Sequence, residues 1–198
     1  MKEVTKMAKD VVEKILDATL EVVAKNKISG TRMHLIAKEA GMSQSNLHYY
    51  YPTKNELLIS LMDELQKRFS EKRIESVDLE KKSVIENIQG LFKEKQDDIL
   101  NHKKVDYAQF DFWVQGTVNP EIKVKFRESF AEWRRNITEV LKQSKTYQNL
   151  DENTKAMLPF IMVSLMMGAS MQYLIDENIF SLDTYFSVAE KLIRNVLK

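Results

Sequence analysis

Hydrophobic positions recur at three- and four-residue steps along most of the chain, which is the spacing of one face of an α-helix. No window shows the sustained apolar/polar alternation of a strand. Only five glycines and three prolines interrupt the pattern. The sequence therefore predicts an all-α protein of about nine helices with short connections.

Capping residues set the expected helix boundaries. The predicted N-caps are Thr31 for the second helix, Ser43 for the third and Thr53 for the fourth. Gly41 is expected to end the second helix, and Pro52 is expected to end the third at about residue 51. The expected helices cover 4–24, 31–40, 43–51, 54–74, 82–102, 107–116, 120–141, 152–177 and 182–197.

One predicted helix is apolar on all sides. Residues 156–175 carry no charge over twenty positions, which is long enough to span a bilayer. Pro159, Ser164 and Gln172 interrupt the stretch, and neither a second span nor a basic flank accompanies it. We therefore interpret it as a buried helix of the core or of a subunit interface, and expect no membrane partner.

The residue composition excludes several kinds of functional site. The chain has no cysteine, which excludes disulfides and thiolate sites and suits a reducing cytoplasm. Its three histidines are scattered, with neither a zinc-protease motif nor a glycine-rich phosphate loop, so we expect no enzyme and no cofactor. Asp98 and His102 lie one turn apart, but without a third ligand this spacing is more typical of an exposed ion pair, and no metal site is predicted.

The region around the second and third helices is basic. The whole chain has a net charge of +1, yet residues 25–54 contain five basic side chains and only one acidic side chain, Glu39. They are Lys25, Lys27, Arg32, Lys38 and Lys54. A local positive patch is typical of a surface that binds phosphates. Two short helices joined through AGMS also have the spacing of a helix-turn-helix motif.

The motif resembles a known family. The stretch ILDATLEVV…TRMHLIAKEAGMSQSNLHYYYPTKNELL, within residues 15–58, is similar to the signature of the tetracycline-repressor (TetR) family of bacterial transcriptional regulators. The resemblance implies a DNA-binding domain over 1–53 and a helical ligand-binding and dimerisation domain over 54–198. It also implies a cytoplasmic homodimer, joined through its last two helices, on a pseudo-palindromic operator of double-stranded DNA.

The resemblance also implies that the protein is a repressor, which a small-molecule effector releases from DNA. The alternative from a different class is a helical protein-interaction or membrane-associated protein whose helix-turn-helix is incidental. Salt-dependent binding to a palindrome separates the two.

Helical geometry assigns the faces of the third helix. At 100° per residue, Leu47 and Tyr51 point toward the core, while Ser45 and Tyr49 point directly away from it. Asn46 and His48 flank that outward face, and Gln44 reaches from the first turn. Gln and Asn can make bidentate contacts to adenine, and Tyr or Ser can bond a base edge or a phosphate.

The remaining DNA-binding residues come partly from the resemblance. Phosphate anchoring is assigned to Thr31, His48 and Lys54, and base reading beyond the third helix to Arg32 and His34. The full predicted interface is Thr31, Arg32, His34, Ser43, Gln44, Ser45, Asn46, His48, Tyr49 and Lys54.

The chain departs from the family pattern at three of these or neighbouring positions. Lys27 stands where a glycine is usual, and Asn26 is expected to take the left-handed conformation instead. Ser45 replaces a second glycine, and His48 replaces a tyrosine that contacts phosphate.

The effector site is the least specified part of the sequence. Aromatic and methionine side chains adapt to apolar ligands, so a small hydrophobic or aromatic effector is expected. The candidate lining residues are Phe92, Phe110, Trp113, Met162 and Met166. At helical spacing, such residues are also typical of ordinary core.

Overall fold

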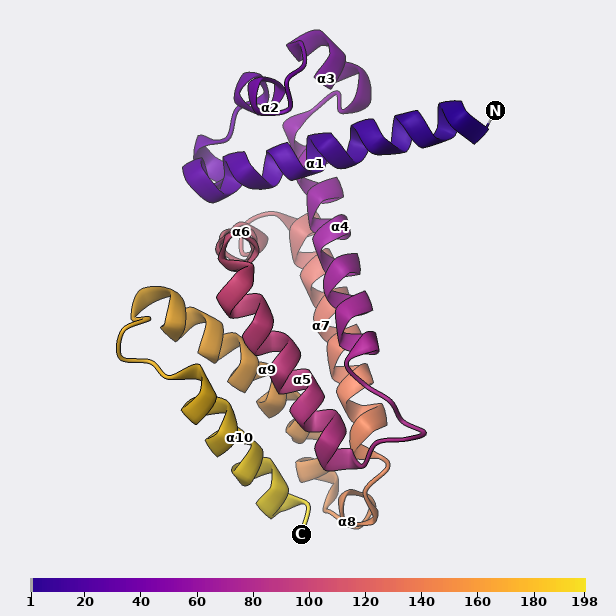
Figure 1. The fold of residues 1–198 in the computed structure, drawn as a ribbon, viewed down its shortest axis with the longest axis vertical. Coiled ribbons are helices and arrows are strands. Elements are labelled where there is room, and N and C mark those ends of the chain that lie inside the picture. The colour runs from indigo at the N-terminus through magenta and orange to yellow at the C-terminus, as the bar shows by residue number, and fades with distance from the viewer. Residues whose placement is uncertain (1) are drawn as a thin grey trace. The chain divides into compact units, whose positions relative to one another are not determined.

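Amphipathic helices account for the fold, and the all-α prediction is confirmed. The structure is a computed structural model that describes residues 2–198, with side chains described from residue 9 onward. The described residues form ten helices and no strand (Figure 1). They divide into two compact units, which we call unit 1 (residues 1–67 and 104–127) and unit 2 (residues 68–103 and 128–198).

Unit 1 carries the helix-turn-helix. It contains α1 (Lys2–Gly30), α2 (Met33–Glu39), α3 (Gln44–Tyr50), the first part of α4 (Lys54–Glu75), most of α6 (Lys103–Gly116) and the start of α7 (Pro120–Leu141). Apolar residues at helical spacing fill its core, and they include Ile15, Leu16, Val22, Val23, Ile36, Ala37, Ala40, Leu47, Leu57 and Leu61.

The turn after α1 corrects one prediction. The residue with positive φ is Lys27 (φ 60°, ψ 166°), and not Asn26. This conformation turns the chain so that both backbone groups of Ile28 are held by side chains. The Ile28 N–H donates to Asp111 Oδ2 of α6, and the Ile28 carbonyl accepts from Lys54 Nζ of α4 at 2.5 Å.

Two of the three N-caps predicted for the helix-turn-helix region are observed in the structure. Ser43 Oγ accepts from the Asn46 N–H at 3.1 Å, and Thr53 Oγ1 accepts from the Glu56 N–H at 3.2 Å, so both predicted caps are confirmed. Gly41 has a φ of 61°, as expected for the turn. The Thr31 cap is wrong, because the N-cap of α2 is Arg32 and makes no side-chain cap bond.

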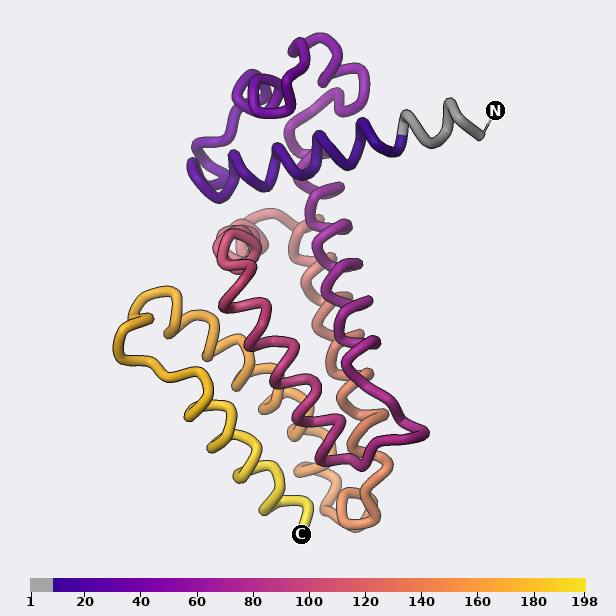
Figure 2. Tube along the Cα trace, viewed as in Figure 1, coloured from indigo at the N-terminus to yellow at the C-terminus, as the bar shows by residue number. Residues whose placement is uncertain are grey.

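Unit 2 is a second helical core. It contains the later parts of α4 and α7 with α5 (Val84–Asn101), α8 (Lys145–Gln148), α9 (Glu152–Ile175) and α10 (Leu182–Val196). In the trace, α5, α9 and α10 run side by side, and their facing sides are apolar (Figure 2). The four-residue α8 was not predicted, and α6 begins four residues earlier than the sequence indicated.

Helix α9 is the long apolar helix noted in the sequence. It is the single described helix whose length and hydropathy could cross a membrane. Leu158, Met162 and Met166 are nevertheless buried in the core of unit 2, and Pro159 is buried inside the helix. These contacts support the interpretation of α9 as a core helix with one remaining exposed face.

Candidate nucleic-acid interface

Helix α3 presents the outward face that its sequence predicted. Leu47 is fully buried, whereas Tyr49 is 81% exposed, so the assigned inward and outward directions are confirmed. Ser43, Gln44, Ser45, Asn46 and His48 are also exposed. A seven-residue helix with hydrogen-bonding groups on its solvent side can enter a major groove, which is about 12 Å wide.

The three consecutive tyrosines have different surroundings. Tyr51 is half-buried, and its hydroxyl lies 2.9 Å from Ser60 Oγ of α4. The half-buried Tyr50 packs edge-on against Tyr49, with ring centroids 5.3 Å apart. Tyr50 therefore supports the Tyr49 ring from one side while the Tyr49 hydroxyl stays in solvent.

His48 is held by two contacts from its own segment. Its Nδ1 lies 3.1 Å from the Pro52 carbonyl, and its Nε2 lies 3.3 Å from Gln44 Nε2. A carbonyl oxygen can only accept, so the Nδ1 carries the proton and the Nε2 of a neutral ring accepts from Gln44. In that tautomer His48 has no N–H left for a phosphate, whereas the protonated ring would gain one at Nε2.

Lys54 connects the interface to the fold. Its ammonium donates to the Ile28 carbonyl, and the side chain is half-buried. Burial, followed by the nearby positive charge of Arg32, lowers the Lys54 pKa, while Asp111 opposes that shift. An ammonium has three donors, so one bond to Ile28 leaves two for a phosphate oxygen.

Other cations surround the motif with their side chains partly engaged. The Arg32 guanidinium is exposed and donates through Nη1 to the Ser29 carbonyl at 2.7 Å. Lys25 forms an ion pair with Glu39 at 3.9 Å. His34 and Lys38 are exposed. The positive patch predicted from the sequence thus lies at the surface, partly offset by Glu39.

Thr31 is placed differently from the sequence-based interface. Its side chain is fully buried, and its hydroxyl donates to the Lys27 carbonyl at 2.8 Å. The hydroxyl therefore stabilises the end of α1 and is not accessible to a phosphate. Sequence reasoning also missed the Pro52 carbonyl, although its position four residues after His48 is the spacing of a helical contact.

The five candidate effector residues are divided between the two units. Phe92, Met162 and Met166 are buried in the core of unit 2. Phe110 and Trp113 lie on the part of α6 that belongs to unit 1, where Trp113 is 51% exposed. The structure thus associates three of the five with the interior of unit 2.

Charged side chains that the sequence did not single out lie inside unit 2. The Arg73 guanidinium is 4.7 Å from the centre of the Trp133 ring, and burial lowers its pKa. Burial and the neighbouring Asp98 raise the pKa of Glu94 to about 8. Arg73 Nε and Trp133 Nε1 are buried donors without an acceptor among the described residues. Such groups inside a core are typical of a site that holds a further polar molecule.

The sequence is similar to those of known bacterial regulatory proteins. Residues 15–61 match the model of bacterial regulatory proteins of the tetR family. The fatty acid metabolism regulator protein of Bacillus subtilis is 28% identical over 130 residues, which are 65% of this chain and 59% of that protein's length.

Two solved structures have the same fold. A transcriptional regulator from Saccharomonospora viridis in complex with choline has a TM-score of 0.82 and 18% identity, covering 94% of this chain and 96% of that one. FadR from Bacillus subtilis in complex with stearoyl-CoA has a TM-score of 0.76 and 18% identity, covering 94% and 97%.

The fold and the exposed recognition helix define a helix-turn-helix protein with a second helical unit. Residues 15–61 carry the match to the tetR family of bacterial regulatory proteins, and the fold of the chain is similar to that of solved transcriptional regulators. The alternative of an incidental helix-turn-helix in an interaction or membrane-associated protein is not favoured.

Proposed function

We propose that the protein is a dimeric, ligand-responsive transcriptional regulator of the cytoplasm, most simply a repressor, without enzymatic activity. The observation that carries this proposal is the outward face of α3, where Tyr49 is 81% exposed beside Ser45 and Asn46. No packing within the described protein explains a tyrosine so exposed, whereas a DNA groove offers its ring and hydroxyl a partner.

The proposed DNA contacts fall into two groups. Gln44, Ser45, Asn46 and Tyr49 would reach base edges from α3, with Arg32 and His34 at its border. Lys54, Ser43 and the protonated form of His48 would hold phosphates. Thr31 is omitted from this interface because its side chain is buried.

The proposed dimer would form through α9 and α10. Both helices pack against the core of unit 2 on one side and keep apolar residues exposed on the other. The exposed residues are Met157, Phe160, Ile161, Met171 and Ile175 on α9 with Val188, Leu192 and Val196 on α10. A two-fold axis through this surface would cover it and pair two recognition helices.

The proposed effector site lies in unit 2, near Phe92, Met162 and Met166. Their apolar side chains suit a hydrophobic portion of a ligand, and the unpaired donors of Arg73 and Trp133 suit an acceptor oxygen. The related structures hold stearoyl-CoA and choline. The apolar lining favours an effector with a hydrocarbon or aromatic portion over a small cation.

DNA selection tests the proposed function. The full-length protein is expected to enrich, from random duplexes, an inverted repeat whose half-sites lie about 10 base pairs apart, centre to centre. An acyl-CoA added to the selected complex should lower the DNA affinity if the effector class is right. Enrichment of no sequence over the starting pool would contradict the proposal.

A further inference from the structure

One side of α6 contacts the last turns of α1 within unit 1. Asp111 of α6 accepts a hydrogen bond from the Ile28 N–H, and the Tyr107 ring centre lies 5.0 Å from Lys27 Nζ. Nearer the start of α6, Lys104 forms an ion pair with a glutamate of α1 at 2.6 Å. These three residues of α6 follow one another at steps of three and four, so they lie on the same side of the helix.

Ile28 is bonded by a charged side chain on each of its backbone groups. Its N–H donates to Asp111 Oδ2, and its carbonyl accepts from Lys54 Nζ at 2.5 Å. We call these two hydrogen bonds the Ile28 contacts. Ile28 is 4% exposed, and a buried backbone group without a partner is costly. Both contacts therefore stabilise the turn that follows the positive φ of Lys27.

Asp111 also acts on Lys54 through its charge. Burial, followed by the positive charge of Arg32, lowers the Lys54 pKa, and the negative charge of Asp111 opposes that shift. The carboxylate thus favours a charged ammonium beside the turn. Asp111 supports Lys54 in two ways, because it also fixes the residue whose carbonyl the ammonium bonds.

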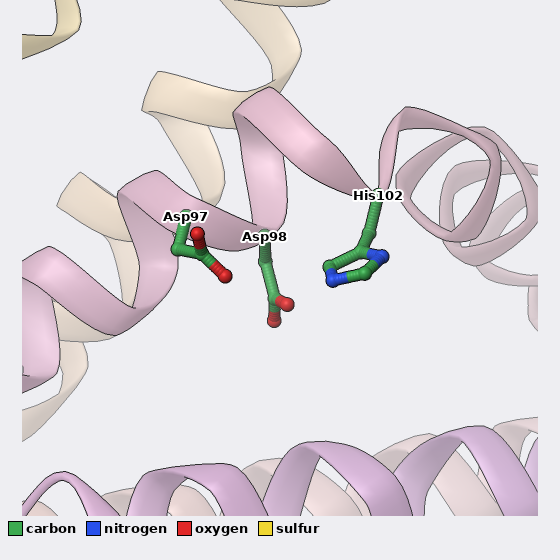
Figure 3. Close-up of side chains that lie close together, drawn as sticks. All are labelled: Asp97, Asp98 and His102. Atoms are coloured by element: carbon green, nitrogen blue, oxygen red, sulfur yellow. The ribbon is translucent and has the colours of Figure 1, made fainter.

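The Ile28 contacts differ from the charged cluster at the end of α5. There Asp98 lies beside Asp97 and His102, and it accepts from Lys72 Nζ at 2.5 Å (Figure 3). That ion pair joins two side chains. In the Ile28 contacts both charged groups bond the backbone of one residue, so loss of either group acts directly on the conformation of the turn.

We propose that Asp111 is a positioning residue for DNA binding, which acts through Ile28 to hold Lys54 where it reaches a phosphate. The inference rests on the proposed function, in which Lys54 contacts the DNA backbone. An ammonium has three donors, and the Ile28 carbonyl uses one of them. Phosphate contacts carry no sequence information, so Asp111 should support the binding of any duplex.

Two substitutions separate the acceptor of Asp111 from its charge. Asp111→Ala leaves the Ile28 N–H without an acceptor, whereas the side-chain oxygen of Asp111→Asn can still accept from it. In anisotropy titrations, Asp111→Ala should bind both the selected and a scrambled duplex at least about fivefold more weakly than wild type. Asp111→Asn should bind both at least about threefold more tightly than Asp111→Ala, because it keeps the acceptor.

A double-variant cycle with Lys54→Ala tests whether Asp111 acts through Lys54. If it does, the double variant binds DNA no more weakly than Lys54→Ala alone. Each single variant should also lower the slope of log affinity against log salt concentration by about one, since one phosphate contact is lost. A general loss of stability would leave this slope unchanged.

Tyr147→Phe is the control for stability. It removes the hydrogen bond from the Tyr147 hydroxyl to the Lys155 carbonyl in unit 2, at 3.0 Å, and should bind both duplexes as wild type does. Wild-type affinity in Asp111→Ala, additive losses in the cycle, or an asparagine variant no tighter than the alanine variant would overturn the inference alone. A wild-type protein that binds neither duplex would contradict the proposed function together with it.

Discussion

At the scale of single residues, Lys27 shows how one strained position organises the motif. Its φ of 60° and ψ of 166° fall in a region that non-glycine residues avoid at a cost of about 1–3 kcal/mol. The turn it makes presents Ile28 to Asp111 and Lys54. The Lys27 ammonium also lies 5.0 Å from the centre of the Tyr107 ring, which compensates for part of the strain.

Paired substitutions at Lys27 isolate the backbone strain. Lys27→Ala and Lys27→Gly both remove the contact with Tyr107, but only glycine adopts the observed φ without a Cβ clash. We expect Lys27→Gly to exceed Lys27→Ala by about 1 kcal/mol in free energy of unfolding, measured by urea denaturation. An alanine variant as stable as the glycine variant would show that the turn is not strained.

The positions of residues in and beside the proposed interface were predictable only where local geometry decides them. Leu47, Tyr49 and Ser43 followed from helical periodicity and capping, which depend on neighbours along the chain. Thr31 and Lys54 instead bond to backbone carbonyls of α1, at Lys27 and Ile28. The Lys27 carbonyl lies four residues before Thr31, which is a helical spacing. The Ile28 carbonyl meets Lys54 only because α4 packs against the end of α1, and residue spacing alone does not specify that contact.

At the scale of helices, the apolar repeat predicted most elements and their approximate ends. It missed α8, because four residues between two longer helices are too short to show a period. Of the candidate lining residues, Phe110 and Trp113 lie on the part of α6 that belongs to unit 1, whereas Phe92, Met162 and Met166 belong to the core of unit 2. Periodicity identifies the apolar side of a helix but not the element that covers it.

The exposed apolar side of α9 provides a prediction about assembly. Ile161 is 50% exposed, and a two-fold interface there would place it against the same helix of the partner. We expect Ile161→Glu to convert the protein from dimer to monomer in analytical ultracentrifugation at micromolar concentration. Glutamate is a good helix former, so the fold should persist.

Leu79→Glu serves as the control for this change. Leu79 is 44% exposed in the connection between α4 and α5, outside the proposed dimer surface. It should leave the protein dimeric. An Ile161→Glu variant that sediments as a dimer would place the subunit contact elsewhere.

At the scale of the whole molecule, the proposed DNA-binding unit and a helical unit with buried polar groups suit a regulator that couples two kinds of binding. The helices α4 and α7 each contribute residues to both units, so the chain passes twice from one unit to the other within a helix. In the proposed function, these two helices are the elements through which a ligand in unit 2 would act on unit 1.

The central claim is that the outward face of α3 reads DNA sequence, and Tyr49→Ala tests it most directly. Fluorescence anisotropy would compare wild type, Tyr49→Ala and the control Leu79→Ala on the selected duplex and on a scrambled duplex at fixed salt. Removing one base contact is expected to cost about 1–3 kcal/mol, or roughly 5- to 150-fold, on the selected duplex only. Equal affinities of wild type and Tyr49→Ala for the selected duplex would contradict the account.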